Sequence, residues 1–116
     1  MSALSPRRTA PVTRVQIARY AGAVGDFNPI HLDDAFAVAA GLPSVIAHGP
    51  LTLALVIDTI VEQVGADGLA SFDARLRAPV LPGDELTVEP TADGVEVRRR
   101  DNTVVVTATL IQRDGQ

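Results

Sequence analysis

Residues 50–64 read PLTLALVIDTIVEQV, and this segment decides the fold. Pro50 suits the first turn of a helix, and Gly65 is positioned to end it. The first two turns are apolar nearly all round, whereas a surface helix is apolar on one face only. The segment therefore predicts a helix that is buried on most of its sides.

After this helix the sequence changes to a period of two. From residue 70 to residue 80, apolar side chains alternate with polar ones, which is typical of a half-buried antiparallel strand. The letters PGD that follow predict a turn. We expect the further strands around residues 85–89, 95–100 and 103–112. An apolar helix packed on antiparallel strands predicts an α+β fold.

The residues before the central helix predict two shorter helices. Thr13 and Gln16 fit a capping box, an apolar helical stripe follows, and Gly25 ends the first helix. Asp33 suits the N-cap of the second helix, which Gly41 ends. The first dozen residues predict a short strand or an extended arm.

Composition favours one soluble globular domain spanning residues 1–116. The chain has 47% hydrophobic and 21% charged residues, and its net charge of −4 argues against a general nucleic-acid binder. The absence of cysteine excludes thiol catalysis and cysteine-ligated metals. The N-terminal letters lack the apolar core of a secretory signal, and no apolar run reaches the length of a membrane span. We therefore expect a cytoplasmic protein.

Residues 25–31 read GDFNPIH and concentrate polar chemistry at one bend. The Asn-Pro pair inside this segment prevents a regular helix, so Asp26 and His31 can face one cavity. A carboxylate beside an imidazole suits general acid–base catalysis. The spacing alone slightly favours an ordinary turn instead, in which Asp26 caps the next turn and His31 binds a backbone group. Phe27 and Ile30 are expected to anchor the bend in the core.

The His48-Gly49 pair at the start of the central helix is a second candidate. The first N–H groups of a helix are unpaired and carry partial positive charge, and Gly49 lets a ligand approach closely. A thioester carbonyl bound there would be stabilised as in an oxyanion hole. The pair equally fits a plain helix start, with His48 as a packed or capping residue.

Two other groupings indicate weaker candidates. His31, Asp33, Asp34 and His48 carry metal-ligating atoms, but their spacing matches no ligand motif and Asp33 is better explained as an N-cap. We therefore expect no metal. The basic run at residues 98–100 could contact phosphates of a nucleotide-bearing ligand, although such runs are more often solvated strand ends.

The letters YAGAVGDFNPIHLDDAFAVAAGLPSVIAHGPLT at residues 20–52 resemble the MaoC-like, (R)-specific enoyl-CoA hydratase family. Residues 72–88, FDARLRAPVLPGDELTV, resemble the strand and turn that follow in that family. The resemblance implies a hotdog fold, in which an antiparallel sheet wraps around one long central helix.

The resemblance also assigns roles to the candidate residues. It implies that Asp26 and His31 are the catalytic pair. It implies that the backbone N–H of Gly49 binds the thioester carbonyl. Asn28, which helps hold the loop, and His48 are grouped with Gly49 as substrate-binding residues.

The implied activity is that of a hydro-lyase of fatty acid metabolism. It would add water to trans-2-enoyl thioesters, or dehydrate (R)-3-hydroxyacyl thioesters, with no cofactor. The expected partners are an acyl-CoA or acyl-carrier-protein thioester and a second hotdog chain, in a homodimer or a heterodimer, with no nucleic acid and no membrane. Two alternatives stay open: a subunit of a heteromeric dehydratase completed by a partner chain, and a hotdog acyl thioesterase. The thioesterase would take its carboxylate from the central helix, where Asp58 and Glu62 lie and only Asp58 is expected to face a buried region.

Overall fold

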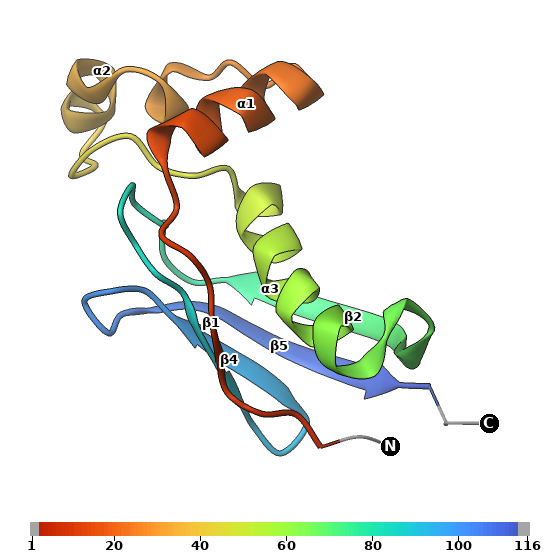
Figure 1. Ribbon diagram of the computed structural model, residues 1–116. Coiled ribbons are helices and arrows are strands. Elements are labelled where there is room, and N and C mark those ends of the chain that lie inside the picture. The colour runs from red at the N-terminus through yellow and green to blue at the C-terminus, as the bar shows by residue number, and fades with distance from the viewer. Residues whose placement is uncertain (1–2, 114–116) are drawn as a thin grey trace.

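A computed structural model describes residues 3–113 and shows an antiparallel sheet with a long helix against one face (Figure 1). The sheet has the strand order β1-β3-β4-β5-β2, with every neighbouring pair antiparallel. The strands are β1 (Arg7–Arg8), β2 (Leu69–Leu76), β3 (Thr87–Pro90), β4 (Gly94–Arg98) and β5 (Val104–Gln112). The helices are α1 (Arg14–Val24), α2 (Asp34–Ala39) and α3 (Gly49–Val64), with short 3₁₀ turns η1 (Pro29–His31) and η2 (Ala66–Gly68). The expected α+β class is confirmed.

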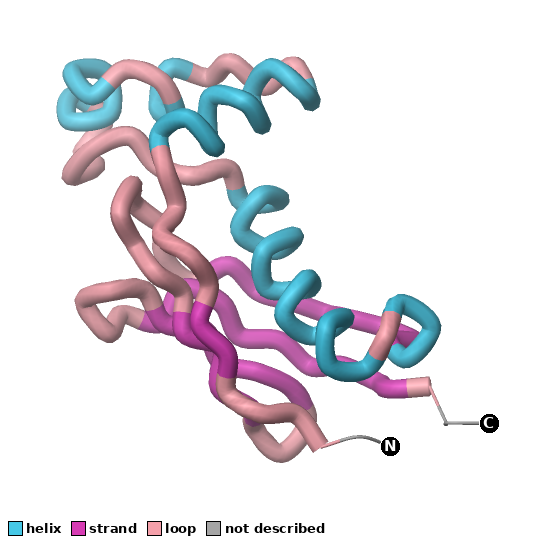
Figure 2. Tube along the Cα trace, in the orientation of Figure 1, coloured by secondary structure: helices cyan, strands magenta, loops and turns pink. Residues whose placement is uncertain are grey.

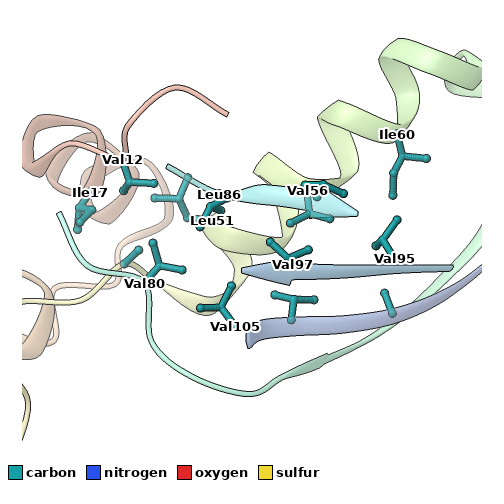
Figure 3. Close-up of a cluster of buried hydrophobic side chains, with 14 residues drawn as sticks. Val12, Ile17, Leu51, Val56, Ile60, Val80, Leu86, Val95, Val97 and Val105 are labelled. Atoms are coloured by element: carbon teal, nitrogen blue, oxygen red, sulfur yellow. The ribbon is translucent and has the colours of Figure 1, made fainter. Parts of the chain in front are cut away.

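The core lies between α3 and the sheet. Val56 and Ile60 of α3 are fully buried, as is Val97 of β4, and these side chains belong to one apolar cluster (Figure 3). Burying one such side chain contributes about 1.5–3 kcal/mol, so this layer is the main stabilising contact of the fold. The expectation of a helix buried on most sides is confirmed.

One stripe of α3 stays exposed, formed by Ala54, Asp58 and Glu62 at helical spacing. The expectation that Asp58 faces a buried region is therefore wrong. The physical reason is its position four residues from two exposed neighbours, on the side of α3 away from the core.

A separate helical layer, made of α1, η1 and α2, lies beyond one end of the sheet (Figure 2). Thr13 accepts a hydrogen bond from the N–H of Gln16, and Asp33 accepts one from the N–H of Phe36, so both predicted N-caps are confirmed. Gly25 adopts the left-handed conformation with φ 73° and ends α1, as the sequence predicts. Within residues 3–113, no helix has both the length and the apolar character that crossing a bilayer requires.

Asp34 holds this layer together. Its Oδ1 accepts the N–H of Val45 at 3.0 Å, and its Oδ2 lies 3.0 Å from the guanidinium of Arg14. The Val45 hydrogen bond first, and then the Arg14 contact, hold the pKa of Asp34 below its ordinary value. One carboxylate thus links α1, α2 and the segment leading to α3.

Strand β2 ends earlier than the alternation predicts. The regular ladder ends at Leu76, with one further hydrogen bond from the N–H of Arg77 to the carbonyl of Val105. Pro79 then has no N–H to donate, and the carbonyl of Val80 accepts from the N–H of Ala47 instead. Leu76 is 52% exposed and Ala70 is exposed, although the alternation places both on the buried face. The departure at Leu76 matters for the site, because this side chain contacts the start of α3.

The other strand ends also shift by about two residues. β3 begins at Thr87 because the preceding Leu86 exchanges hydrogen bonds with Thr9 outside the regular ladder. β4 ends at Arg98 because Arg99 enters a tight turn, in which Asn102 takes a left-handed conformation with φ 72°. The short strand expected near the N-terminus is present as β1.

Candidate active site

The GDFNPIH bend links α1 to α2 and is held by its own side chains. The Oδ1 of Asn28 accepts the N–H of Ile30 at 3.2 Å and caps η1. The N–H of Asn28 donates to Oδ1 of Asp26 at 3.3 Å, so one carboxylate oxygen is fixed by the turn. The capped turn is thus present, and it also leaves the second oxygen of Asp26 facing the imidazoles.

The apolar residues of the bend divide between core and surface. Ile30 is half-buried and its carbonyl accepts the N–H of Ile46, whereas Phe27 is 61% exposed. The expectation that Phe27 anchors the bend is wrong, because Phe27 precedes the capped turn and extends away from the covered side. The hydrogen-bonded turn holds the bend instead.

His31 is buried, with only 8% of its surface exposed, and its ring is oriented by the backbone. Its Nδ1 lies 2.7 Å from the carbonyl oxygen of Ile46; a carbonyl only accepts, so Nδ1 donates and carries the proton. In the neutral ring, Nε2 then presents a lone pair, 3.9 Å from Oδ2 of Asp26. This gap is too long for a direct hydrogen bond, but two hydrogen bonds of about 2.8 Å to one water span it.

His48 lies enclosed beneath this pair. Its ring stacks on that of His31, with centroids 3.7 Å apart and planes at 21°, and the Tyr20 ring lies 4.9 Å away on a tilt. Its Nε2 lies 3.1 Å from the backbone carbonyl oxygen of Asp26 and 4.0 Å from Oδ2 of the same residue. The structure therefore brings both histidines and Asp26 together.

Gly49 begins α3 directly after His48, with Pro50 behind it. Among the described residues its N–H has no acceptor, as is usual in the first helical turn, and it carries partial positive charge. Its φ lies outside the left-handed region, so the backbone does not require glycine there. The nearest obstacle to a larger residue is a movable side chain: an added Cβ would lie 2.6 Å from Cδ1 of Leu76, which would have to shift. Sequence reasoning missed Leu76, whose only signal is a large apolar residue among polar ones at a strand end.

The structure separates the four metal-ligating candidates of the sequence into two groups. Asp33 caps α2 and Asp34 pairs with α1, whereas ligand atoms of Asp26, His31 and His48 lie within 4.8 Å of one another. Nε2 of His48, 3.1 Å from the backbone carbonyl oxygen of Asp26, must donate a proton to that oxygen and so has no lone pair for an ion, and Nδ1 of His31 is likewise engaged by Ile46. The cluster is therefore a poor fit to a metal ion and a good fit to proton transfer.

The basic run has local acidic partners. Arg98 lies 2.6 Å from Glu96, and Arg99 contacts Asp101 through two nitrogens. The Arg99 guanidinium, and then hydrogen bonds from Thr103, hold the pKa of Asp101 far below its ordinary value. The pairing of Arg98 and Arg99 with partners inside the chain favours a structural role at the strand end over a phosphate site.

A carboxylate and an imidazole are spaced for one water near the unpaired N–H at the start of a buried helix, an arrangement that can exchange protons with a bound molecule. The chain belongs to the family of MaoC-like domains, whose sequence profile matches residues 2–114.

Named relatives agree with this assignment. The chain is 38% identical over 91 residues to the enoyl-CoA hydratase ChsH3 of Mycobacterium tuberculosis, a match of 71% of this chain and 32% of that protein. It is 32% identical over 102 residues to the (R)-specific enoyl-CoA hydratase of Aeromonas caviae, covering 86% of this chain and 74% of that protein. The chain thus spans about a third of the first of these relatives and about three quarters of the second.

A solved structure shares the whole architecture. The ChsH1-ChsH2 complex of Mycobacterium tuberculosis matches with a TM-score of 0.73 at 26% identity, covering 92% of this chain and 91% of that chain. Likeness to hydratase structures confirms the hotdog fold expected from the sequence.

Proposed function

We propose that this chain is a hydro-lyase that adds water to trans-2-enoyl thioesters, or removes it from (R)-3-hydroxyacyl thioesters. The observation that supports this most is the 3.9 Å gap between Oδ2 of Asp26 and Nε2 of His31, beside the free N–H of Gly49. Two relatives, an enoyl-CoA hydratase and an (R)-specific enoyl-CoA hydratase, agree with it.

The proposed reaction uses each group at a stated atom. A water between Asp26 and His31 donates its hydrogens to Oδ2 and Nε2, both of which can accept. As the pair takes a proton from this water, the water oxygen attacks C3 of the enoyl group. The pair then returns a proton to C2. The pair ends each turnover with the protons it began with, so one water is added and nothing else is consumed.

The thioester oxygen gains negative charge as C3 is attacked. The N–H of Gly49, in the first turn of α3, is the group that would bind this oxygen, where the helix end carries partial positive charge. The thioester itself makes C2 acidic, so we propose that no metal or redox cofactor takes part. Asn28 contributes by capping the turn that orients Asp26.

The test is a panel of enoyl-CoA and enoyl-acyl-carrier-protein thioesters, followed by loss of the ultraviolet absorbance of the conjugated enoyl group. Hydration and release of free thiol are measured in parallel. The proposal expects absorbance loss without free thiol. Free thiol release would instead favour the thioesterase alternative, although Asp58 and Glu62 lie exposed on α3 rather than beside Gly49.

We further propose that the acting unit contains two hotdog chains. Strand β2 lies at one edge of the sheet, next to β5 alone, and Leu76 is half-exposed at its end beside Gly49. A second chain on this side would cover Leu76 and complete the acyl path. The name of the ChsH1-ChsH2 complex keeps a heteromeric dehydratase open as the second candidate.

Light scattering on the purified chain, then on the chain co-expressed with a second hotdog chain, separates the two assemblies. An active homodimer supports the first, and activity that appears only with the second chain supports the heteromer. The cytoplasmic location expected from the sequence stays a prediction, which fractionation of the native cells would test.

A further inference from the structure

His48 is the most deeply buried side chain of the site, with 1% of its surface exposed. The resemblance groups it with the substrate-binding residues, yet its ring is enclosed by the Tyr20 ring, the His31 ring and the backbone of Asp26. We propose that His48 is a positioning residue: as a neutral imidazole with its proton on Nε2, it fixes the separation of Asp26 and His31. This inference rests on the proposed hydration reaction and deepens it.

The hydrogen bond to Asp26 sets the tautomer. A backbone carbonyl only accepts, so the contact of 3.1 Å requires a proton on Nε2 of His48. The other nitrogen, Nδ1, is buried and has no hydrogen-bond partner among the described residues. A second proton there would create a buried N–H without an acceptor, which costs free energy. His48 is therefore held neutral.

The stack with His31 also favours the neutral form of His48. Two cationic imidazoles with centroids 3.7 Å apart would repel each other strongly in a buried site. Among the described residues, the ionisable groups around the His48 ring are Asp26, His31 and Tyr20, and only Asp26 supplies an opposite charge. A neutral His48 therefore leaves the transferable proton to the Asp26–His31 pair.

One residue thus contacts both members of the pair. The ring Nε2–H of His48 donates to the backbone carbonyl of Asp26. The face of the same ring sets the plane of the His31 ring, whose Nδ1 is already fixed by Ile46. Loss of either contact would let the gap of 3.9 Å change. A displacement of about 1 Å in a catalytic group can cost on the order of 10²-fold in rate.

Two substitutions separate the two contacts. His48→Phe keeps a ring against His31 and removes the donor, whereas His48→Gln keeps an N–H near the position of Nε2 and removes the ring. We expect His48→Phe to lower kcat by about 10²-fold with KM changed little, and His48→Gln to recover about tenfold of that loss. A raised KM at unchanged kcat in both variants would overturn the inference in favour of direct substrate binding.

Thermal unfolding of both variants is the matched control. If the losses in kcat followed the losses in stability, with no recovery in His48→Gln, the role would be structural and the inference would fail.

A second readout does not need activity. The chain contains only two histidines, and both lie in the site, so ¹⁵N ring spectra of an untagged protein hold two imidazoles. The His31→Gln variant assigns them. In neutral buffer we expect His48 to carry its proton on Nε2 and His31 to carry one on Nδ1. A His48 ring that is cationic, or protonated on Nδ1 alone, would refute the inference.

These readouts distinguish the two proposals. A wild-type chain that hydrates no enoyl thioester, with the expected tautomers, would contradict the proposed function while supporting the geometry of His48. An active wild type whose His48→Phe variant keeps full kcat would contradict the positioning role alone.

Discussion

Replacing Gly49 by alanine tests how closely β2 approaches the start of α3. The new Cβ would lie 2.6 Å from Cδ1 of Leu76, whereas apolar carbons pack at about 3.5–4.0 Å. The separation must therefore grow by about 1 Å. Leu76 is 52% exposed and can swing outward, so the net change in stability should be within about 1 kcal/mol.

Activity should respond more than stability. The proposed function places the thioester against the N–H of Gly49 and the Leu76 side chain, and a displacement of about 1 Å there can cost on the order of 10²-fold in kcat/KM. Apart from its chain neighbours and the backbone of α3, the same Cβ lies within 4 Å of Leu76 atoms alone, and a Leu76→Ala background removes them. We therefore expect Gly49→Ala to cost at least tenfold less in that background, a strong coupling between contacting residues.

The assay compares kcat/KM for enoyl thioester hydration in the wild type, the two single variants and the double variant, with chemical denaturation of each. Equal losses from Gly49→Ala in both backgrounds would refute the reasoning, because the loss would then not come from contact with Leu76.

Two further predictions concern stability. Gly25→Ala should destabilise the protein by about 1–2 kcal/mol in urea unfolding, because φ at this position is 73° and an added Cβ would meet no neighbouring atom. The control Gly22→Ala, inside α1 and equally open, should be neutral or stabilising. Equal effects of the two substitutions would contradict the left-handed end of α1. The pKa of Asp34 is lowered in the folded state, so its stabilising contribution is present above the ordinary carboxyl pKa of 3.8 and is lost as the pH falls toward the lower folded value. Asp34→Asn should therefore lower stability at neutral pH and flatten its acid dependence, and an unchanged curve would show that the contacts to Val45 and Arg14 stabilise nothing.

Local signals in the sequence predict the helices well. Thr13, Asp33 and Gly25 set helix ends through their own side chains or backbone freedom, so neighbouring letters suffice to find them. The apolar run of α3 is long enough to identify a buried helix. The strand ends are less predictable because they depend on partners distant in sequence, as when Val80 pairs with Ala47 instead of continuing β2.

The candidate site is likewise predictable in part: its motif residues can be found from neighbouring letters, but its long-range contacts cannot. The motif letters single out Asp26 and His31, and the structure brings them within 3.9 Å across a gap that fits one water. The stack of His48 on His31 and the contact of Leu76 with Gly49 join segments far apart in the chain. Hydrophobic periodicity does not record such contacts, so the sequence offers His48 as a packed, capping or substrate-binding residue without predicting its stack on His31.

The measurement that tests the central claim most directly is kcat of Asp26→Asn on an enoyl thioester that the wild type hydrates. Asparagine keeps the size of the side chain and an oxygen for the N–H of Asn28, but it removes the charge and the basic oxygen facing His31. We expect kcat to fall by about 10²–10⁴-fold with an unchanged unfolding midpoint, and the same loss in His31→Ala. A folded Asp26→Asn protein that turns over like the wild type would contradict the account.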